Sequence, residues 1–240
     1  MVDVISGLAK ALELIITGDP LIYGVVYRTL LFSGIAVILA SLWGTPISML
    51  IALKDFRGKA LVKTFFNSLI GIPTVVLGLV FYLVFSKGGP LGFLELLFTP
   101  GAIIIGEAVL VTPILISIMT NAIEAVDPQI MNLAKTLGAS ASQASVAVLR
   151  EAVNGVILSN IASFNRAIAE LGVALLVGGN IAGLTDVLTT AISRYTQSGD
   201  LGFAIALGMI LMIIVFVING LVIMARKAKW LLTIWKTPSW

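Results

Sequence analysis

Residues 29–53 read TLLFSGIAVILASLWGTPISMLIAL, a stretch without a single Asp, Glu, Lys or Arg. A helix of about 20 apolar residues is long enough to cross the hydrocarbon core of a bilayer. Residues 201–225 form a second stretch of the same kind. Two such stretches predict that the main solvent of this protein is the lipid bilayer.

The overall composition agrees with a membrane protein. Hydrophobic residues make up 59% of the chain, charged residues 11%, and the mean hydropathy is +1.10, whereas a soluble domain carries about 25% charged residues. The net charge of +3 does not indicate nucleic-acid binding, because the basic residues flank apolar stretches. The chain has no cysteine and no histidine, which excludes thiol and imidazole chemistry and most zinc sites. We therefore predict no catalytic residue and no metal site.

Five transmembrane helices are predicted in total, because three further apolar stretches are long enough to span, at 65–85, 102–123 and 155–177. Residues 1–28 are expected to form an external segment with an amphipathic helix over 4–17, too short and too charged to span. Ten Lys and Arg residues lie in the segments on the side of the C-terminus, against four on the other side. Because basic loops stay in the cytoplasm, this bias predicts an N-out, C-in topology for the transmembrane core 29–225, with a basic cytoplasmic tail at 226–240.

The segment 127–152, predicted to be cytoplasmic, carries strong helix signals. Asp127 and Pro128 suit the cap and first position of a helix over 129–137, and Gly138 suits a chain reversal. Ser140 is then a cap for a second helix over 141–150. The spacing predicts a helix–turn–helix finger, which either docks on another protein or packs beneath its own bundle.

The finger sequence NLAKTLGASASQASVAVLR, residues 132–150, resembles the cytoplasmic signature loop of ABC importer permeases. It departs from that pattern at Asn132, where an acidic residue is common, and at Glu151, where proline is usual. In the family this loop forms the coupling helix that inserts into the ATPase subunit. The resemblance therefore implies ATPase contacts for the central residues of the finger, namely Ala134, Lys135, Leu137, Gly138, Ala139 and Ser140.

Three later motifs, FNRAIAELG at 164–172, GGNIAG at 178–183 and LTTAI at 188–192, resemble the oxyanion branch of these permeases. They are closer to tungstate permeases than to molybdate or sulfate permeases. The resemblance implies a type I importer fold in the cell membrane, a homodimer, two cytoplasmic ATPase subunits and an extracytoplasmic binding protein. ATP and Mg are then expected on the ATPase, with no cofactor in this chain.

Two charged residues stand inside the fourth predicted span. Arg166 and Glu170 lie four apart, hence on one face of a helix, and a lone charge at mid-membrane costs about 2.5–3.5 kcal/mol. A structural ion pair, with Glu107 as a possible competitor, and a direct role in translocation both remain open. The candidate residues for the translocation path are Ser163, Asn165, Arg166 and Glu170.

Residues 184–196 are predicted to form a short outer helix after the Gly178–Gly179 pair. By resemblance this region is the external lid, with Gly178, Gly179, Asn180, Thr189 and Thr190 as its candidate residues. The alternative is an interfacial helix that caps the bundle.

No phosphate-binding loop is present in the sequence, so ATP hydrolysis is expected in another chain. Two other classes of function are disfavoured. An intramembrane enzyme would have only Glu107 and Glu170 as a carboxylate pair and lacks a plausible catalytic constellation, and a secondary transporter or channel would have to work alone. In the family the binding protein sets most of the anion selectivity, so molybdate and sulfate remain alternatives to tungstate.

Overall fold

The structure is a computed structural model that describes residues 9, 12–13 and 15–234. All regular elements within these residues are helices, which confirms the predicted all-α fold. Three helices are long and apolar enough to cross a membrane, α2 (Pro20–Leu53), α5 (Pro100–Glu124) and α11 (Leu201–Ile234). Two bent helix pairs raise the possible number of spans to five, in agreement with the predicted five.

The second predicted span is two helices rather than one. Helix α3 (Lys59–Leu69) and helix α4 (Thr74–Phe85) meet at an angle of 94°. Helix α3 ends at Leu69, and the residue before a proline avoids the helical conformation, so Ile72 before Pro73 does not continue it. Pro73 itself has an extended backbone with ψ of 121°. A continuous helix over 65–85 was therefore the wrong expectation.

The fourth predicted span is also interrupted. Helix α8 (Val153–Ile168) stops before Glu170, and a short helix α9 (Gly172–Gly178) follows. At its other end α8 bends by 70° from α7 (Ala141–Glu151) at Ala152. The span predicted over 155–177 is thus composed of two helices with a break at residues 169–171.

Three predicted boundaries differ from the structure. Helix α2 begins nine residues before 29, because the Asp19 side chain accepts a hydrogen bond from the Leu21 N–H at 2.8 Å and Pro20 suits the first turn. Helix α10 (Leu188–Gln197) begins four residues after 184, because residues 181–187 form a tight turn. Helix α11 continues past 225 into the predicted tail. Most of the predicted amphipathic helix at 4–17 and residues 235–240 of the tail lie outside the described residues.

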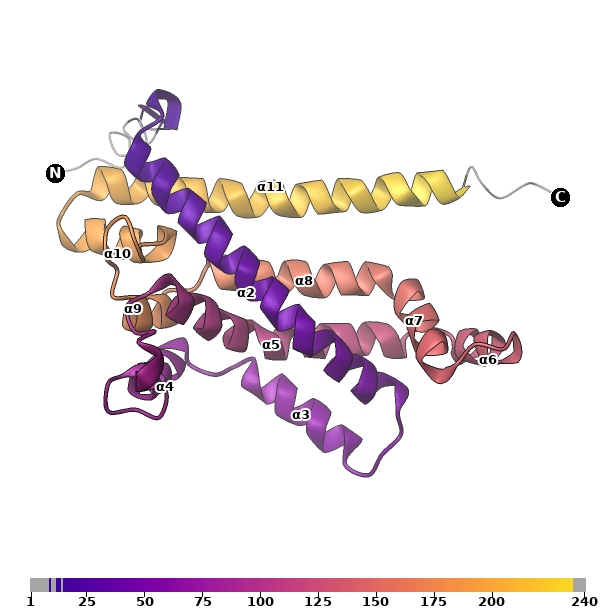
Figure 1. Ribbon diagram of the computed structural model, residues 1–240. Helices are drawn as coiled ribbons and strands as arrows, with labels where there is room; N and C mark the ends of the chain where they lie inside the picture. Colours follow the sequence, from indigo (N-terminus) through magenta and orange to yellow (C-terminus); the bar gives the residue numbers. More distant parts are fainter. Residues whose placement is uncertain (1–8, 10–11, 14, 235–240) are drawn as a thin grey trace.

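The elements are arranged with a protruding finger at one end and a cap of short helices at the other (Figure 1). The finger consists of α6 (Pro128–Thr136) and α7, and the cap includes α9, α10 and the 3-10 turn η1 (Gly92–Leu94). Helix α5 lies between α2 and α8 and packs against both. Helix α11 runs along one side and contacts mainly α10, with a smaller contact to α8.

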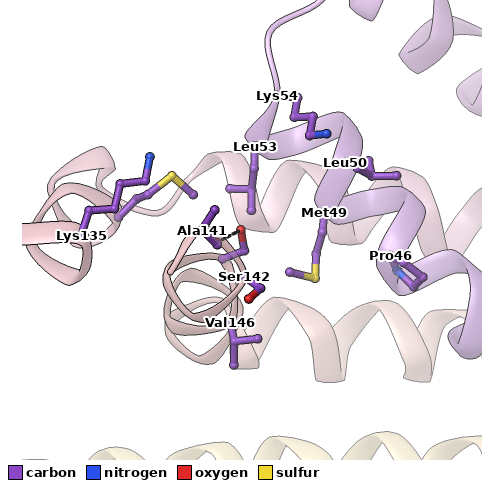
Figure 2. Close-up of a pocket in the computed structure, with 11 residues that line it drawn as sticks. Pro46, Met49, Leu50, Leu53, Lys54, Lys135, Ala141, Ser142 and Val146 are labelled. Atoms are coloured by element: carbon purple, nitrogen blue, oxygen red, sulfur yellow. Dashed lines mark hydrogen bonds between the residues drawn. The ribbon is translucent and has the colours of Figure 1, made fainter. Parts of the chain in front are cut away.

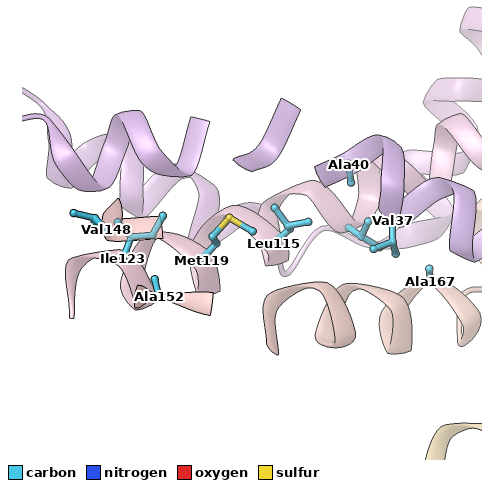
Figure 3. Close-up of a cluster of buried hydrophobic side chains, with 9 residues drawn as sticks. Val37, Ala40, Leu115, Met119, Ile123, Val148, Ala152 and Ala167 are labelled. Carbon is cyan, nitrogen blue, oxygen red and sulfur yellow. The ribbon is translucent and has the colours of Figure 1, made fainter. Parts of the chain in front are cut away.

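Figure 3 shows the buried cluster that joins the finger to the bundle. At one end Val148 and Ala152 pack with Ile123 and Met119 of α5. The cluster continues along α5 to α2 and α8, where its remaining members are Val37, Ala40, Val111, Leu115 and Ala167. The base of the finger therefore shares its core with the spanning helices.

Candidate functional site

The finger is held in shape by local caps. The Asp127 carboxylate accepts a hydrogen bond from the Gln129 N–H at 2.9 Å, at the start of α6. Gly138 has φ of 86°, a left-handed conformation that favours glycine, and the chain reverses there. Ser140 and Gln143 form a reciprocal capping box at the start of α7, with distances of 2.8 and 3.3 Å. These contacts make the finger a defined unit that can transmit force.

The finger exposes apolar side chains at the end away from the bundle. Leu133 is 62% exposed and Leu137 is 80% exposed. Large apolar side chains at a polar tip are typical of an interaction surface. Among the other residues expected to contact the ATPase, Ala134 and Ala139 are half-buried and joined by a backbone hydrogen bond of 3.0 Å, while Lys135, Gly138 and Ser140 are exposed.

Glu170 connects three helices at the break between α8 and α9. Its Oε2 atom pairs with Arg166 Nη1 at 2.8 Å, and its Oε1 atom accepts the Val173 N–H of α9 at 3.0 Å. The Thr189 hydroxyl of α10 donates to the Glu170 backbone carbonyl. Glu170 is 2% exposed, whereas Arg166 and Thr189 are partly exposed. The contact with the Val173 N–H is therefore the one that is protected from water and correspondingly strong. A movement of α8 is thereby linked to α9 and α10.

Glu107 does not compete for Arg166. Its Oε2 atom instead accepts a hydrogen bond from the Ser33 hydroxyl of α2 at 3.0 Å, in a fully buried setting. Glu107 and Glu170 therefore have separate partners, and this arrangement does not favour the alternative in which they act as a catalytic pair.

Two predicted path residues present polar atoms without partners. The buried Ser163 hydroxyl has no hydrogen-bond partner among the described residues, and neither does Asn165 Oδ1. The Asn165 amide nitrogen donates to Asn219 Oδ1 of α11 at 3.0 Å. Buried polar atoms are normally satisfied, so these two unpartnered oxygen atoms are among the few exceptions in the described part of the chain.

Asn219 is a residue that the sequence analysis missed. It is the one amide in the otherwise apolar stretch 201–225, and such a residue in a spanning helix usually finds a polar partner. That isolation was a usable signal. Its partner Asn165, however, is 54 residues away, and only the packing of α8 against α11 shows the pair.

The predicted lid residues lie together at the α9–α10 turn. Gly179 has φ of 68°, and an added Cβ would lie 2.7 Å from the Phe98 ring. Asn180 donates from its amide to the Thr190 carbonyl at 3.1 Å, and the Thr190 hydroxyl accepts the Val187 N–H at 3.0 Å. The backbone carbonyl of Gly178 accepts a hydrogen bond from the Thr185 hydroxyl at 2.6 Å.

An ion-pair cluster beside this turn was also missed. Asp186 pairs with Arg28 of α2 at 2.6 Å and with Arg194 of α10 at 3.4 Å. Its carboxylate also accepts the Gly183 N–H at 2.9 Å. This cluster explains why the turn 181–187 is not helical and why α10 starts late. Within the described residues no three Asp or Glu side chains gather as metal ligands.

Comparison with known proteins places this architecture in a family. Residues 44–228 match the binding-protein-dependent transport system inner membrane component family. The chain is 36% identical to a tungstate uptake system permease protein of Peptoclostridium acidaminophilum, over 90% of this chain and 95% of that one. It is 39% identical to a probable anion ABC transporter permease protein of Haloferax volcanii, over 80% and 85% of the two chains.

The fold also matches a solved transporter. A chain of the MetNI methionine ABC transporter, in an inward-facing conformation, superposes with a TM-score of 0.69 at 18% identity, covering 87% of this chain and 95% of that chain. The likeness agrees with the predicted importer-permease fold. This chain belongs to the family of binding-protein-dependent transport system inner membrane components, which are multi-pass permeases of ABC transporters whose ATPase is a separate subunit.

Proposed function

We propose that this chain is the permease of a tungstate importer. The observation that carries the proposal is its likeness to a tungstate uptake permease along 90% of its length. The motifs at 164–172, 178–183 and 188–192 support the same assignment through their resemblance to the oxyanion branch. The binding protein captures the anion outside the cell and delivers it to the α9–α10 end.

The working unit in this proposal is a homodimer. Helix α11 supports it, because this apolar helix contacts little of its own chain and exposes Met212, Ile213, Phe216 and Val217. A second copy related by a two-fold axis would cover part of this surface and close a pathway between the two chains. The remaining apolar surface would face lipid.

In this proposal the ATPase subunits drive transport through the finger. Each of two ATPase subunits binds ATP and Mg and receives one finger, with the exposed Leu133 and Leu137 as its apolar anchors. Closure of the ATPases on ATP moves α6 and α7. The buried cluster at Val148 and Ala152 carries that movement to α5 and α8, and the pathway opens on alternate sides of the membrane.

The pathway binds its cargo weakly. A tetrahedral dianion must leave as easily as it enters, so hydrogen-bond donors serve better than a fixed cluster of cations. Ser163 and Asn165 supply polar atoms of this kind on α8. Arg166 remains partly exposed at 31% of its side chain although it pairs with Glu170, and a passing anion can reach it.

The decisive experiment reconstitutes the chain in proteoliposomes with its cognate ATPase and binding protein. Tungstate uptake is expected only with both partners and MgATP. Uptake by the chain alone would contradict the importer mechanism and identify a self-sufficient secondary transporter.

The cargo is tested separately with the binding protein. Titration with tungstate, molybdate and sulfate, followed by calorimetry, is expected to show the tightest binding for tungstate. Tighter binding of molybdate or sulfate would retain the oxyanion importer and replace its substrate.

A further inference from the structure

A groove lies at the base of the finger, between the end of α2 and helix α7, with a volume of about 550 Å³ (Figure 2). Its walls are mostly apolar, with Met49, Leu50 and Leu53 on α2 facing Val146 on α7. The α2 wall runs from Pro46 to Lys54, which is about 12 Å along a helix axis. The groove therefore extends over about two turns of a spanning helix from its predicted cytoplasmic end.

Two lysines flank this groove. Figure 2 shows Lys54 at the end of α2 and Lys135 on α6. Both side chains are exposed, and neither forms a salt bridge or a side-chain hydrogen bond with any described residue. A neighbouring groove shares Ser142 and Val146 with the first and adds Arg150. No Asp or Glu lines either groove.

The part of the finger base that adjoins the groove at Leu53 and Met131 has the reverse charge. There a smaller pocket of about 270 Å³ is lined by Asp55, Glu124 and Asp127, with no Lys or Arg in its lining. The lysines nearest to that side, Lys59 and Lys63, are already paired with Glu124 at 3.2 and 2.5 Å. The free positive charge at the finger base thus lies on the groove side.

We propose that this groove binds an anionic phospholipid of the cytoplasmic leaflet. The phosphate would lie at the level of Lys54 and Lys135, and an acyl chain would lie along Met49, Leu50 and Val146. Basic pockets beside spanning helices on the cytoplasmic side are suited to such headgroups, and the apolar walls fit the chain rather than a free anion. The exposed tip leucines do not line the groove, so they remain available to the ATPase, whereas Lys135, which is also a predicted ATPase contact, would lie at the boundary between the two partners.

The proposal is tested on the purified full-length chain by native mass spectrometry in detergent, with phosphatidylglycerol and phosphatidylcholine of identical acyl chains. We expect tighter binding of phosphatidylglycerol. Lys54→Gln is expected to weaken that binding about fivefold, the effect of one basic residue near an anionic headgroup, and to leave phosphatidylcholine binding unchanged. Ser142→Trp, a change at an exposed position, fills the groove and is expected to weaken binding of both lipids.

Arg57→Gln is the matched control, because Arg57 is an exposed cation on the same side of the membrane that does not line the groove. An equal loss with Arg57→Gln would mean general charge attraction and would overturn the site. Equal binding of the two lipids by the unmodified chain would overturn it as well.

The occupant is identified by a photo-crosslinker placed at position 146 in native membranes. Attachment to phospholipid supports the proposal. Attachment to the ATPase or to a second copy would overturn it and assign the groove to a protein interface. Neither result depends on which anion is transported, so the failure of this proposal is distinct from the failure of the tungstate proposal.

Discussion

Arg28 on the first spanning helix binds Asp186 in the turn before α10, although the two residues are 158 positions apart. The guanidinium contacts the Asp186 carboxylate at 2.6 Å and donates from Nε to the Asp186 carbonyl at 3.0 Å. The Asp186 side chain is 3% exposed. This double contact fastens the outer end of α2 to the predicted lid.

Replacing Arg28 should loosen that attachment. Arg28→Ala leaves a buried carboxylate whose remaining contacts are the Gly183 N–H at 2.9 Å and the longer ion pair with Arg194 at 3.4 Å. The loss of a charged hydrogen bond costs about 2 kcal/mol, which corresponds to a fall in Tm of about 5 °C for a chain of this size. Thermal unfolding in detergent measures this fall in Tm. Arg194→Ala is the control and should have a smaller effect, because its contact is longer and its side chain more exposed; an equal effect would contradict the assignment.

The turn of the finger can be tested at its glycine. Gly138→Ala places a Cβ at φ of 86° and costs about 1 kcal/mol of local strain. Gly58, with φ of 93° and equally open surroundings, is a matched control. We expect Gly138→Ala to reduce ATPase binding and uptake while Gly58→Ala leaves both near normal. Co-purification with the ATPase gives the readout, and equal behaviour of the two variants would argue against coupling through the finger.

A substitution at the exposed tip of the finger tests the ATPase contact without straining the backbone. Leu137 is 80% exposed, so Leu137→Asp should leave Tm within about 1 °C, because surface substitutions usually change stability by less than 0.5 kcal/mol. If Leu137 is an apolar anchor, ATPase binding should fall at least tenfold. Normal binding by this variant would exclude Leu137 from the interface.

Variants of Arg166 can distinguish a structural ion pair with Glu170 from a direct role of Arg166 in the translocation path. We expect Arg166→Ala to assemble with the ATPase and to lose uptake. The double variant Arg166→Gln, Glu170→Gln removes both charges together and so avoids leaving Glu170 buried and unpaired. If the pair is only structural, the double variant restores uptake. Continued loss of uptake assigns Arg166 to translocation, and normal uptake in Arg166→Ala would rule that role out.

Close packing between α4 and α9 depends on Gly78. A Cβ added there would lie 2.9 Å from the Gly172 carbonyl oxygen and 3.1 Å from the Val173 Cα. Both are backbone atoms that cannot move aside, so Gly78→Ala should force the helices apart and lower Tm by several degrees. Gly34→Ala is the matched control, because nothing lies within 4 Å of its added Cβ. A similar Tm for the two variants would show that the contact is not limiting.

The finger was the most predictable part of the candidate site. Its signals at Asp127, Gly138 and Ser140 are local, since each cap forms within a few residues of chain. The predicted helix starts and ends there agree with the structure to within one residue. The ATPase contacts assigned to this finger remain predictions.

The breaks in the second and fourth spans were harder to predict. Glycine and proline inside an apolar stretch allow either a kinked helix or a full break, and Pro46 and Pro113 lie within continuous helices. Pro73, by contrast, lies in the break between two helices that meet at 94°. Local sequence does not distinguish these outcomes, because neighbouring helices decide which freed backbone groups find partners.

The sequence by itself determined that this chain is an all-helical membrane protein and where its long apolar helices lie. Charged residues are costly in lipid, so their absence from a long stretch of sequence marks a spanning helix. It also determined the finger, because helix caps are local hydrogen bonds. Only the tertiary structure decided that Arg28 pairs with Asp186, that Ser33 rather than Arg166 contacts Glu107, and that Glu170 joins three helices. Those contacts join residues from separate helices, and their partners are fixed only when the helices pack side by side.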